Sequence, residues 1–336
     1  MKLDIMYCCN DLYAPFLGIS MVSLLEANRD AEAITVYIIY DRVSKENLER
    51  FRRQAASFGD TRQVVLIDGE RHIQHLQGMN IIPYRGSHAN DLRLFFSEHI
   101  KPDVTRLLYL DCDTLICGSL QELFETDMGT APAGVVLDSL SGYYKHMIGL
   151  KASDTYFNSG VILFDVAQWK LQNCEQRLHD LLSQPNFHYP NPDQDFLNLL
   201  LRKNKYILSP RYNFQVTHQV YSDKVYFHTY PHTGYYTDEQ LEDARKAPVI
   251  LHAYRFLGQF PWHKDSLHPW HALFWQHAAR SEWADLVPLE SKGALFALER
   301  ILFRLVPHRM FLPILQAMQK YTFHKKERQI RKRGAR

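Results

Sequence analysis

The sequence predicts an α/β fold in which helices cover the faces of a parallel sheet. The main observation is that short apolar, β-prone runs alternate with helical segments along the first part of the chain. Such alternation favours parallel strands joined by helical crossovers. The chain has 336 residues, of which 46% are hydrophobic and 23% charged. It can therefore bury a large core, as one α/β domain with an appendage or as two small domains.

Three strands and two helices are expected in the first part of the chain. The apolar runs at residues 2–9, 35–40 and 64–67 have the length and composition of buried strands. Residues 13–27 carry apolar side chains at helical spacing, and Ser44 is placed to cap a charged helix after the second strand.

The same pattern continues through the middle of the chain. Helices are expected at residues 92–100 and 195–202, and strands at residues 106–110, 133–137, 160–165 and 249–252. Thr237 and Gln240 have the spacing of a capping box, which predicts a short helix after Thr237.

The character of the sequence changes near Pro288. Residues 295–306 form an amphipathic pattern, Pro307 and Pro313 are expected to break it, and residues 310–318 are again apolar. We therefore expect a main α/β domain of residues 1–285 and a helical, basic carboxyl-terminal region of residues 286–336.

Basic residues are concentrated at the carboxyl terminus. Seven of the 39 Lys and Arg residues lie there, with Glu327 as the only acid: Lys325, Lys326, Arg328, Arg331, Lys332, Arg333 and Arg336. The rest of the chain is mildly acidic, so a nucleic-acid-binding protein is not expected. An apolar amphipathic segment followed by basic residues is typical of a segment that lies on an anionic membrane. The alternatives are a solvated, disordered end or a basic arm for RNA.

The cysteines and the amino terminus indicate the cellular compartment. Five cysteines are present, without a C-x-x-C pair, so neither a disulfide framework nor a zinc site is expected. The first residues lack the apolar run of a signal peptide, and no uncharged run approaches the ~20 residues of a membrane span. We expect a cytoplasmic protein, peripheral on the inner face of the plasma membrane.

The strongest local signal for chemistry is a pair of aspartates after an apolar strand. Asp111 and Asp113 follow the run at residues 107–110, and an apolar run resumes after them. Ligands of open α/β sheets bind at the carboxyl ends of strands, and a divalent cation would neutralise the two carboxylates there. His252 ends the last expected strand and suits Mn²⁺ as a third ligand. The alternative is a strand-end turn with capping aspartates.

Two other segments carry polar residues beside expected elements. Asp193 and Gln194 begin a helix, where an acid also serves as a first-turn cap. Asn158 and Gly160 precede an apolar strand, where they permit close approach of a ligand or simply form a turn.

These motifs, in this order, resemble those of glycosyltransferase family 8, which includes bacterial lipopolysaccharide galactosyl- and glucosyltransferases. The resemblance runs from Met1 to about Trp275 and rests on residues 109–113, 157–161 and 193–195, and on His252 with Gly258, Pro261 and Trp262. It implies a GT-A fold with a mixed sheet flanked by helices, a UDP-sugar donor and retention of anomeric configuration. Asp111, Asp113 and His252 match the ligands of Mn²⁺, for which Mg²⁺ is the alternative.

The resemblance also assigns residues to the donor nucleotide sugar. Tyr13 matches the aromatic residue that stacks on uracil, and Asn10 stands where the family usually has an Asp that touches the base. Arg93 matches a donor-binding arginine, and Cys112 lies between the metal-binding aspartates. The remaining matches are Asp138 and Asn158 near the donor sugar, Asp193 at the sugar hydroxyls, Gln194 under the anomeric carbon, and Gly258 in the histidine motif.

One departure from the family concerns the diphosphate. The family usually carries a Lys directly before Pro-Trp, whereas Phe260 precedes Pro261 in this sequence and the loop after His252 is longer. Lys264 is the nearest residue that could supply the missing charge.

The predicted activity is transfer of a hexose, galactose or glucose, from a UDP-sugar to a bacterial surface glycan, including a lipid-linked glycan. Gln194, Asp193 and Arg93 are the expected catalytic residues, and front-face attack is favoured because an amide is a poor nucleophile. Two alternatives remain open. One is a nucleotidyltransferase, although residues 10–13 do not form a glycine-rich phosphate loop. The other is a non-catalytic sugar-nucleotide-binding or membrane-scaffold protein.

Overall fold

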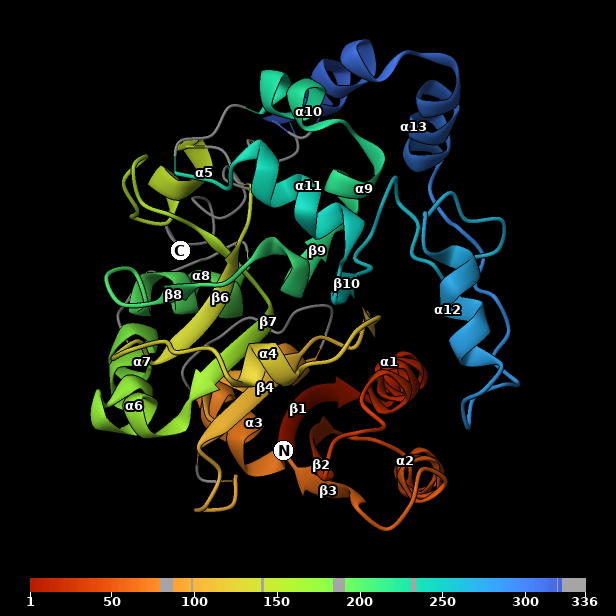
Figure 1. The fold of residues 1–336 in the computed structure, drawn as a ribbon. Helices are drawn as coiled ribbons and strands as arrows, with labels where there is room; N and C mark the ends of the chain where they lie inside the picture. Colours follow the sequence, from red (N-terminus) through yellow and green to blue (C-terminus); the bar gives the residue numbers. More distant parts are fainter. Residues whose placement is uncertain are drawn as a thin grey trace.

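A seven-stranded sheet lies at the centre of the computed structural model, which describes residues 1–78, 87–97, 99–139, 142–183, 191–230, 234–318 and 320–321. The strand order is β3-β2-β1-β4-β7-β6-β8 (Figure 1). Its parallel part consists of β1 (Lys2–Asn10), β2 (Ala33–Asp41), β3 (Arg62–Asp68) and β4 (Arg106–Leu110). Helices α1 (Ala14–Ala27) and α2 (Lys45–Ala56) make the crossovers between β1, β2 and β3.

The sheet becomes mixed beyond β4. Strand β7 (Phe157–Asp165) pairs antiparallel with β4 and with β6 (Ala133–Leu137), and β8 (Tyr206–Ile207) pairs parallel with β6. A mixed sheet flanked by helices is the fold class that the family resemblance implied, whereas the alternation of strands and helices alone had predicted a parallel sheet.

A second, three-stranded sheet brings distant parts of the chain together. Strand β10 (Ile250–His252) pairs antiparallel with β5 (Thr114–Ile116) and parallel with β9 (Phe214–Gln215). In this register His252 lies opposite Thr114, which directly follows Asp113. Strand pairing therefore places the histidine beside the two aspartates.

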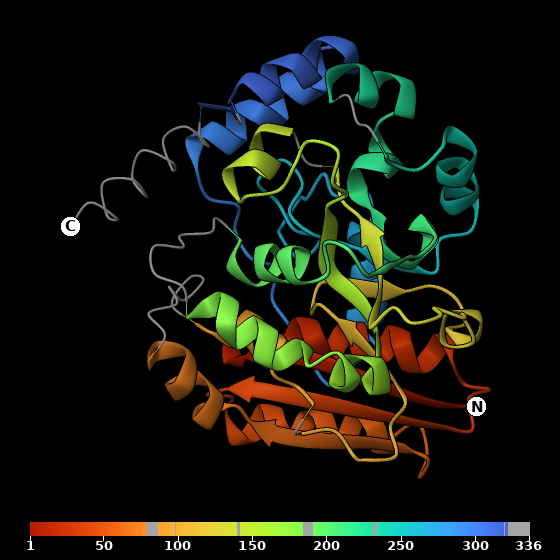
Figure 2. The same cartoon turned by 90° about the vertical axis from the view of Figure 1, so that its left-hand side faces the viewer.

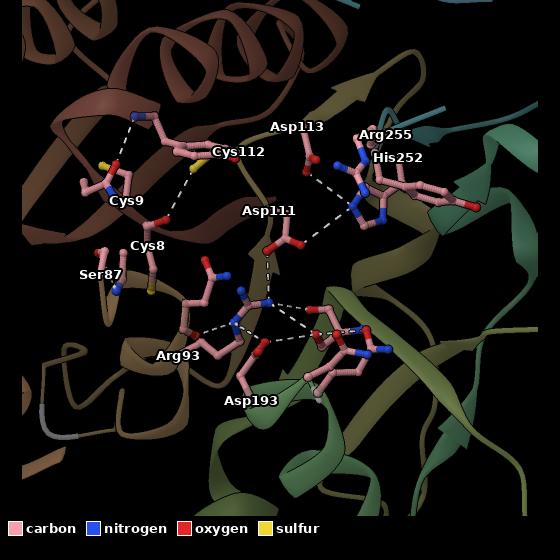
Figure 3. A pocket seen from close by; sticks show the side chains of 18 of the residues that line it. Cys8, Cys9, Ser87, Arg93, Asp111, Cys112, Asp113, Asp193, His252 and Arg255 are labelled. Carbon is pink, nitrogen blue, oxygen red and sulfur yellow. Dashed lines mark hydrogen bonds and ion pairs between the residues drawn. The ribbon is translucent and has the colours of Figure 1, made fainter. Parts of the chain in front are cut away.

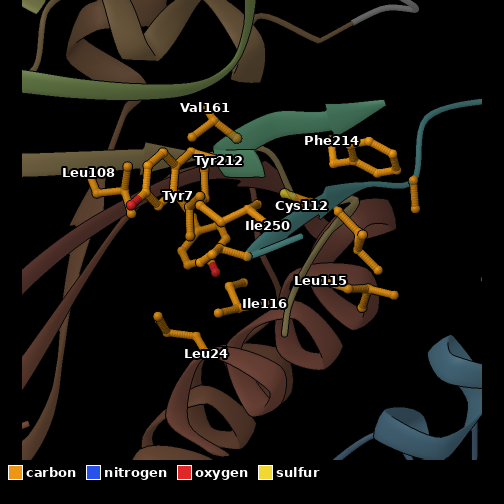
Figure 4. Packing of buried hydrophobic residues seen from close by; sticks show 14 of the residues in the cluster. Tyr7, Leu24, Leu108, Cys112, Leu115, Ile116, Val161, Tyr212, Phe214 and Ile250 are labelled. Atoms are coloured by element: carbon orange, nitrogen blue, oxygen red, sulfur yellow. The ribbon is translucent and has the colours of Figure 1, made fainter. Parts of the chain in front are cut away.

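Both faces of the main sheet are buried, because alternate side chains of its strands point into two hydrophobic layers. Ile5 and Tyr7 of β1 lie in the layer beneath α1, whereas Met6 and Cys8 lie in the other layer. Figure 4 shows the first layer, in which Leu24 of α1 packs with residues of both sheets.

The second layer is covered by helices from the middle of the chain. These are α6 (Val166–Leu171), α7 (Cys174–Leu182) and α8 (Pro192–Leu200), with the 3-10 helix η2 (Ala89–Leu94). The remaining short elements are η1 (Asp11–Tyr13), α3 (Glu70–Gly78), α4 (Gln121–Phe124), α5 (Gly142–Met147), η3 (Pro210–Asn213), α9 (Val216–Val220), α10 (Asp223–Thr229) and α11 (Asp238–Lys246).

Several boundaries differ from the sequence prediction. The helix expected at residues 92–100 is the 3-10 helix Ala89–Leu94. Beyond it, the backbone N–H of Ser97 donates to the Glu175 carboxylate instead of to a helical carbonyl. Strand β7 begins at Phe157, before the expected residue 160. Helix α8 begins at Pro192, before the expected residue 195, since proline favours the first helical position.

The carboxyl-terminal helices pack on the main domain. They are α12 (His271–Ala278), α13 (Ala294–Leu305) and a helical segment at residues 308–318, and Figures 1 and 2 place the last two beside α10 at the end of the molecule far from β3. The prediction that Pro313 breaks the helix is wrong. Phe311 and Leu312 are buried in the core beside it, and this packing offsets the one hydrogen bond that proline removes.

The basic cluster at residues 325–336 lies outside the described residues. The division between residues 285 and 286 stays a prediction. Within the part of the chain that the structure describes, no helix combines the length and hydrophobicity needed to cross a membrane.

Candidate active site

A cavity of about 480 Å³ opens at the carboxyl ends of β1 and β4 (Figure 3). It is bordered by the turn after β4, the start of β7, the start of α8 and the loop after β10. Of the predicted site residues, it brings together Asn10, Tyr13, Arg93, Asp111, Cys112, Asp113, Asn158, Asp193, Gln194 and His252.

Asp111, Asp113 and His252 form a cluster with the geometry of a metal site. Each offers one ligand atom, and these atoms all lie within 4.8 Å of one another. The Nε2 atom of His252 is 3.3 Å from an Asp113 oxygen and 3.7 Å from an Asp111 oxygen. Two carboxylates and one imidazole suit a divalent cation such as Mn²⁺ or Mg²⁺, so the residues present fit such an ion.

A hydrogen bond with Asn213 fixes the orientation of the His252 ring. Its Nδ1 atom lies 3.0 Å from the side-chain oxygen of Asn213, and this hydrogen bond leaves Nε2 directed at the aspartates. Burial alone would lower the pKa of His252, but the carboxylates of Asp113 and Asp111 raise it above its usual value. The imidazole therefore lies in a region of strongly negative potential, and the same potential would favour binding of a metal ion.

Gly160 makes room for this histidine. A Cβ atom at residue 160 would lie 2.8 Å from both Asp111 Oδ2 and His252 Nδ1, and nearer still to His252 Cε1. The Phe157–Gly160 segment is part of strand β7 rather than a turn. Glycine is needed at residue 160 because Asp111 and His252 occupy the space that a side chain would fill.

Arg93 is buried beside the cluster and pairs with one of its acids, Asp111, and with Asp193. Its guanidinium lies 2.9 Å from Asp111 and 3.5 Å from Asp193, donates to the Ser159 carbonyl, and stacks over the Tyr109 ring at 4.2 Å. Although burial opposes the charge, Asp111 raises the pKa of Arg93 further above its usual range. Arg93 is therefore a permanent cation that holds both carboxylates in place.

Asp193 and Gln194 project into the cavity from the first turn of α8. Burial raises the pKa of Asp193 to about 6, and Arg93 opposes this change. Both ends of the Gln194 amide are engaged: Oε1 accepts from the Ser159 N–H at 2.9 Å, and Nε2 donates to the Tyr156 hydroxyl at 3.0 Å. The amide is held in a single orientation.

Asn10, Tyr13 and Cys112 line the side of the cavity near β1. Asn10 caps η1 by accepting the N–H of Tyr13 at 3.1 Å. The Cys112 thiol donates to the Cys8 carbonyl, and burial raises the pKa of this thiol well above its usual value. Cys112 is thus a neutral packing residue in this structure.

Asp138 lies behind the cavity lining rather than in it. Its carboxylate accepts a hydrogen bond from the Asn158 side chain at 3.3 Å. Asn158 lines the cavity, so Asp138 contacts a lining residue without lining the cavity itself. Burial raises the pKa of Asp138, and the hydrogen bond from Asn158 counteracts this.

Gly258 and Lys264 do not line the cavity. Gly258 has a positive φ of 77° and faces the Phe296 ring of α13. The Lys264 ammonium is exposed and lies 3.6 Å from Glu290. The donor contacts expected of Gly258 and Lys264 stay predictions.

Tyr254 and Arg255 also line the cavity, although the sequence motifs did not point to them. Phe260, which stands in place of the family's usual Lys, lines the cavity as well. Arg255 follows His252 by three residues, so a cation close to a metal-ligand candidate was the available signal. Phe260 stacks on Trp262 at a ring distance of 4.4 Å and presents an apolar surface.

The mixed sheet, with an acidic cavity at the ends of its strands, has the GT-A fold. The model of glycosyl transferase family 8 matches residues 4–266, and the chain belongs to this family. The resemblance inferred from the sequence motifs is confirmed.

Curated relatives agree with the family. Over 292 residues the chain is 25% identical to General stress protein A of Bacillus subtilis, covering 84% of this chain and 94% of that protein. Over 201 residues it is 32% identical to a lipopolysaccharide 1,2-glucosyltransferase of Escherichia coli, with 58% of each chain covered. Over 291 residues it is 25% identical to the lipopolysaccharide 1,3-galactosyltransferase of Salmonella typhimurium, covering 84% and 80% of the two chains.

Solved structures agree with the fold. The galactosyltransferase LgtC, in complex with donor and acceptor sugar analogs, superposes with a TM-score of 0.63 at 24% identity, covering 83% of this chain and 96% of that chain. The bifunctional glycosyltransferase WbbM superposes with a TM-score of 0.67 at 18% identity, covering 84% and 50% of the two chains.

Proposed function

We propose that this protein is a retaining, Mn²⁺-dependent hexosyltransferase that transfers galactose or glucose from a UDP-sugar to a bacterial surface glycan. The observation that carries the proposal is the cluster of Asp111, Asp113 and His252 inside the cavity, beside the Arg93–Asp193 pair. A divalent cation held by the three residues would supply the charge that stabilises a departing diphosphate.

The residues of the chain have complementary roles in this proposal. Tyr13 and Asn10 form the wall assigned to the uracil base, and Asp193 is directed to accept hydrogen bonds from the sugar hydroxyls. Arg93 keeps Asp111 and Asp193 in position by direct ion pairs. The acids are therefore oriented before the donor arrives, which reduces the reorganisation needed during reaction.

The fixed amide of Gln194 favours front-face attack. A neutral amide bound at both ends is a poor nucleophile, so a covalent sugar intermediate on this residue is not expected. The acceptor hydroxyl would attack the face that the diphosphate leaves, and the departing phosphate oxygen would accept its proton.

The acceptor class is proposed from the relatives. Two of them are named as lipopolysaccharide glucosyl- and galactosyltransferases, which supports a bacterial surface glycan, including a lipid-linked one, as acceptor. The names cover both galactose and glucose transfer, so both donors stay in the proposal.

The first test measures turnover of the donor. Hydrolysis or transfer of radiolabelled UDP-galactose and UDP-glucose is expected to require Mn²⁺, and Asp113→Ala should lower it by orders of magnitude. Asp60→Ala, at an exposed site far along the sequence from the cluster, is the matched control. Normal turnover of Asp113→Ala in EDTA would show that the metal assignment is wrong.

A thermal-shift panel of UDP-sugars identifies the donor and tests the alternatives. Stabilisation by one UDP-hexose with Mn²⁺ supports the proposal, since a ligand that binds the native state raises its stability. Binding without any turnover would favour the non-catalytic sugar-nucleotide-binding alternative, whereas release of diphosphate from a nucleoside triphosphate would favour a nucleotidyltransferase.

We also propose that the protein docks on the inner face of the plasma membrane through α13 and the basic tail. The outward face of α13 consists of Leu295, Leu298, Ile301 and Leu305, which are 53%, 49%, 53% and 76% exposed. These residues recur every three or four positions and form one apolar stripe. An exposed apolar stripe near a basic segment favours binding to anionic lipid.

Substitution of the outward face tests docking better than truncation, because Phe311 and Leu312 belong to the core and their deletion would expose it. Leu298→Gln combined with Ile301→Gln should reduce cosedimentation with anionic liposomes and leave donor hydrolysis intact. Leu171→Gln, at a 74% exposed leucine of α6, is the control. Unchanged cosedimentation would exclude α13 as the membrane contact.

A further inference from the structure

The cavity contains a second arginine, Arg255, in the loop after His252. We propose that Arg255 is the cation that binds the donor diphosphate, and that Phe296 of α13 holds its guanidinium in position. This inference rests on the proposed UDP-sugar donor. It would make α13 part of the donor site as well as the proposed membrane contact.

The pairing of the charged side chains in the cavity singles out Arg255 as the cation for a diphosphate. Among the described residues that line it, Arg93 and Arg255 are the Lys and Arg side chains. Arg93 is fully buried and already engaged with Asp111, Asp193 and the carbonyls of Asn90 and Ser159. Arg255 is exposed to the open cavity, so it is the arginine able to meet an incoming anion.

Arg255 is better placed for this charge than Lys264, the residue considered from the sequence. Phe260 lines the cavity, but its side chain is apolar and stacked on Trp262. Lys264 does not line the cavity, and its ammonium lies near Glu290. A guanidinium also suits phosphate better than an ammonium, because its planar array of N–H groups can donate two parallel hydrogen bonds.

A tight turn fixes the chain directly after Arg255. The backbones of Phe256 and Gln259 are joined by reciprocal hydrogen bonds of 2.7 and 2.8 Å, and Leu257 and Gly258 between them have φ values of 48° and 77°. Two successive positive φ values define a type I′ turn, the turn that best matches the twist of a two-stranded hairpin. The turn holds Arg255 close to His252.

Helix α13 packs against this turn. A Cβ atom at Gly258 would lie 2.6 Å from Phe296 Cδ1, so the phenyl ring occupies the space that glycine leaves open. Arg300 of the same helix donates to the Leu257 carbonyl at 3.3 Å. The longer loop after His252 is therefore anchored on α13 at two points.

The same phenyl ring supports the arginine. The Arg255 guanidinium carbon lies 4.7 Å from the centre of the Phe296 ring, which is within the range of a cation–π contact. One face of the guanidinium is thus covered by the ring, while its N–H groups stay available for phosphate oxygens. Phe296 acts as a positioning residue, and Arg255 is the residue that touches the donor.

The test is binding of UDP, UMP and uridine by calorimetry in the presence of Mn²⁺. Arg255→Ala should weaken UDP about tenfold to a hundredfold, the range of a lost charge-assisted hydrogen bond, and leave uridine unchanged. Arg255→Lys should recover part of the loss. Phe296→Leu should weaken UDP about twofold to fivefold, as for loss of a cation–π contact, with Phe296→Met as a second variant if the first melts early.

Controls separate this inference from the proposed function. Arg304→Ala removes an exposed charge of the same helix and should bind UDP like the parent protein. Equal UDP affinity of Arg255→Ala and the parent would overturn the assignment, and a loss in Lys264→Ala instead would transfer the role to Lys264. If the parent protein itself binds none of the three uridine compounds, the proposed donor is wrong rather than the role of Arg255.

Discussion

Replacement of Gly160 by alanine should weaken metal binding while the protein still folds. Gly160 lies in β7, and its φ is not among the positive values, so alanine suits its backbone. The added Cβ atom would lie 2.8 Å from both Asp111 Oδ2 and His252 Nδ1. Non-bonded carbon atoms pack at ~3.5–4.0 Å, so the imidazole or the carboxylate has to retreat by roughly 1 Å.

A shift of this size exceeds what a metal site tolerates. Ligand distances are typically held to about 0.2 Å, and even disturbing the partner of a ligand costs about tenfold to a hundredfold in metal affinity. We therefore expect Gly160→Ala to weaken Mn²⁺ binding by at least ~100-fold, or about 2.7 kcal/mol, and to lower donor turnover at limiting Mn²⁺. Overpacking should lower the free energy of unfolding by about 1–3 kcal/mol.

The assay is Mn²⁺ titration by calorimetry, with circular dichroism to verify the fold. Gly134→Ala is the control, because this strand glycine is also crowded, but the atoms nearest to an added Cβ belong to Met128 and Leu208 rather than to Asp111 or His252. Gly134→Ala should bind Mn²⁺ normally. A folded Gly160→Ala protein with the Mn²⁺ affinity of the parent would refute the reasoning that this glycine makes space for the ligands.

Three other perturbations address packing and pH. A Cβ atom at Gly18 would overlap the Trp283 ring, so Gly18→Ala should lose about 1–3 kcal/mol in urea unfolding despite the helix propensity of alanine. Burial raises the pKa of Asp193 to about 6, so kcat/KM should fall as the pH drops through 6, and Asp193→Asn should lack this limb. Burial raises the pKa of Asp195 to about 7, compared with about 3.9 in an unfolded chain; the stability that this carboxyl contributes is thus complete below pH 4 and lost as the pH rises to 7. Between pH 4 and 7 the parent should therefore lose up to about 4 kcal/mol of unfolding free energy relative to Asp195→Asn, which cannot ionise at this position. A difference between the two proteins that stays constant with pH in urea titrations would contradict the raised pKa.

The parts of the site that the sequence could predict are those set by local pattern. Asp111 and Asp113 follow a continuous apolar run, and His252 ends another, so their place at strand ends was available without a structure. The Ser44 cap and the Thr237–Gln240 capping box are likewise formed by residues three positions apart.

The parts that the sequence could not predict depend on contacts between distant residues. The helix expected after residue 92 is a short 3-10 segment, because burial of Arg93 against Asp111 fixes the chain there and Glu175 binds the following backbone. The contact between Arg255 and Phe296 joins a loop to a helix more than 40 residues later, and no spacing rule signals it.

The three-stranded sheet β5-β10-β9 has a consequence for synthesis of the protein. Asp113 and His252 are almost 140 residues apart in the chain, and pairing of β10 with β5 brings them together. A nascent chain on the ribosome that has not yet released β10 lacks one ligand and the hydrogen-bond network behind it. Assembly of the candidate metal site should therefore coincide with the last stages of folding.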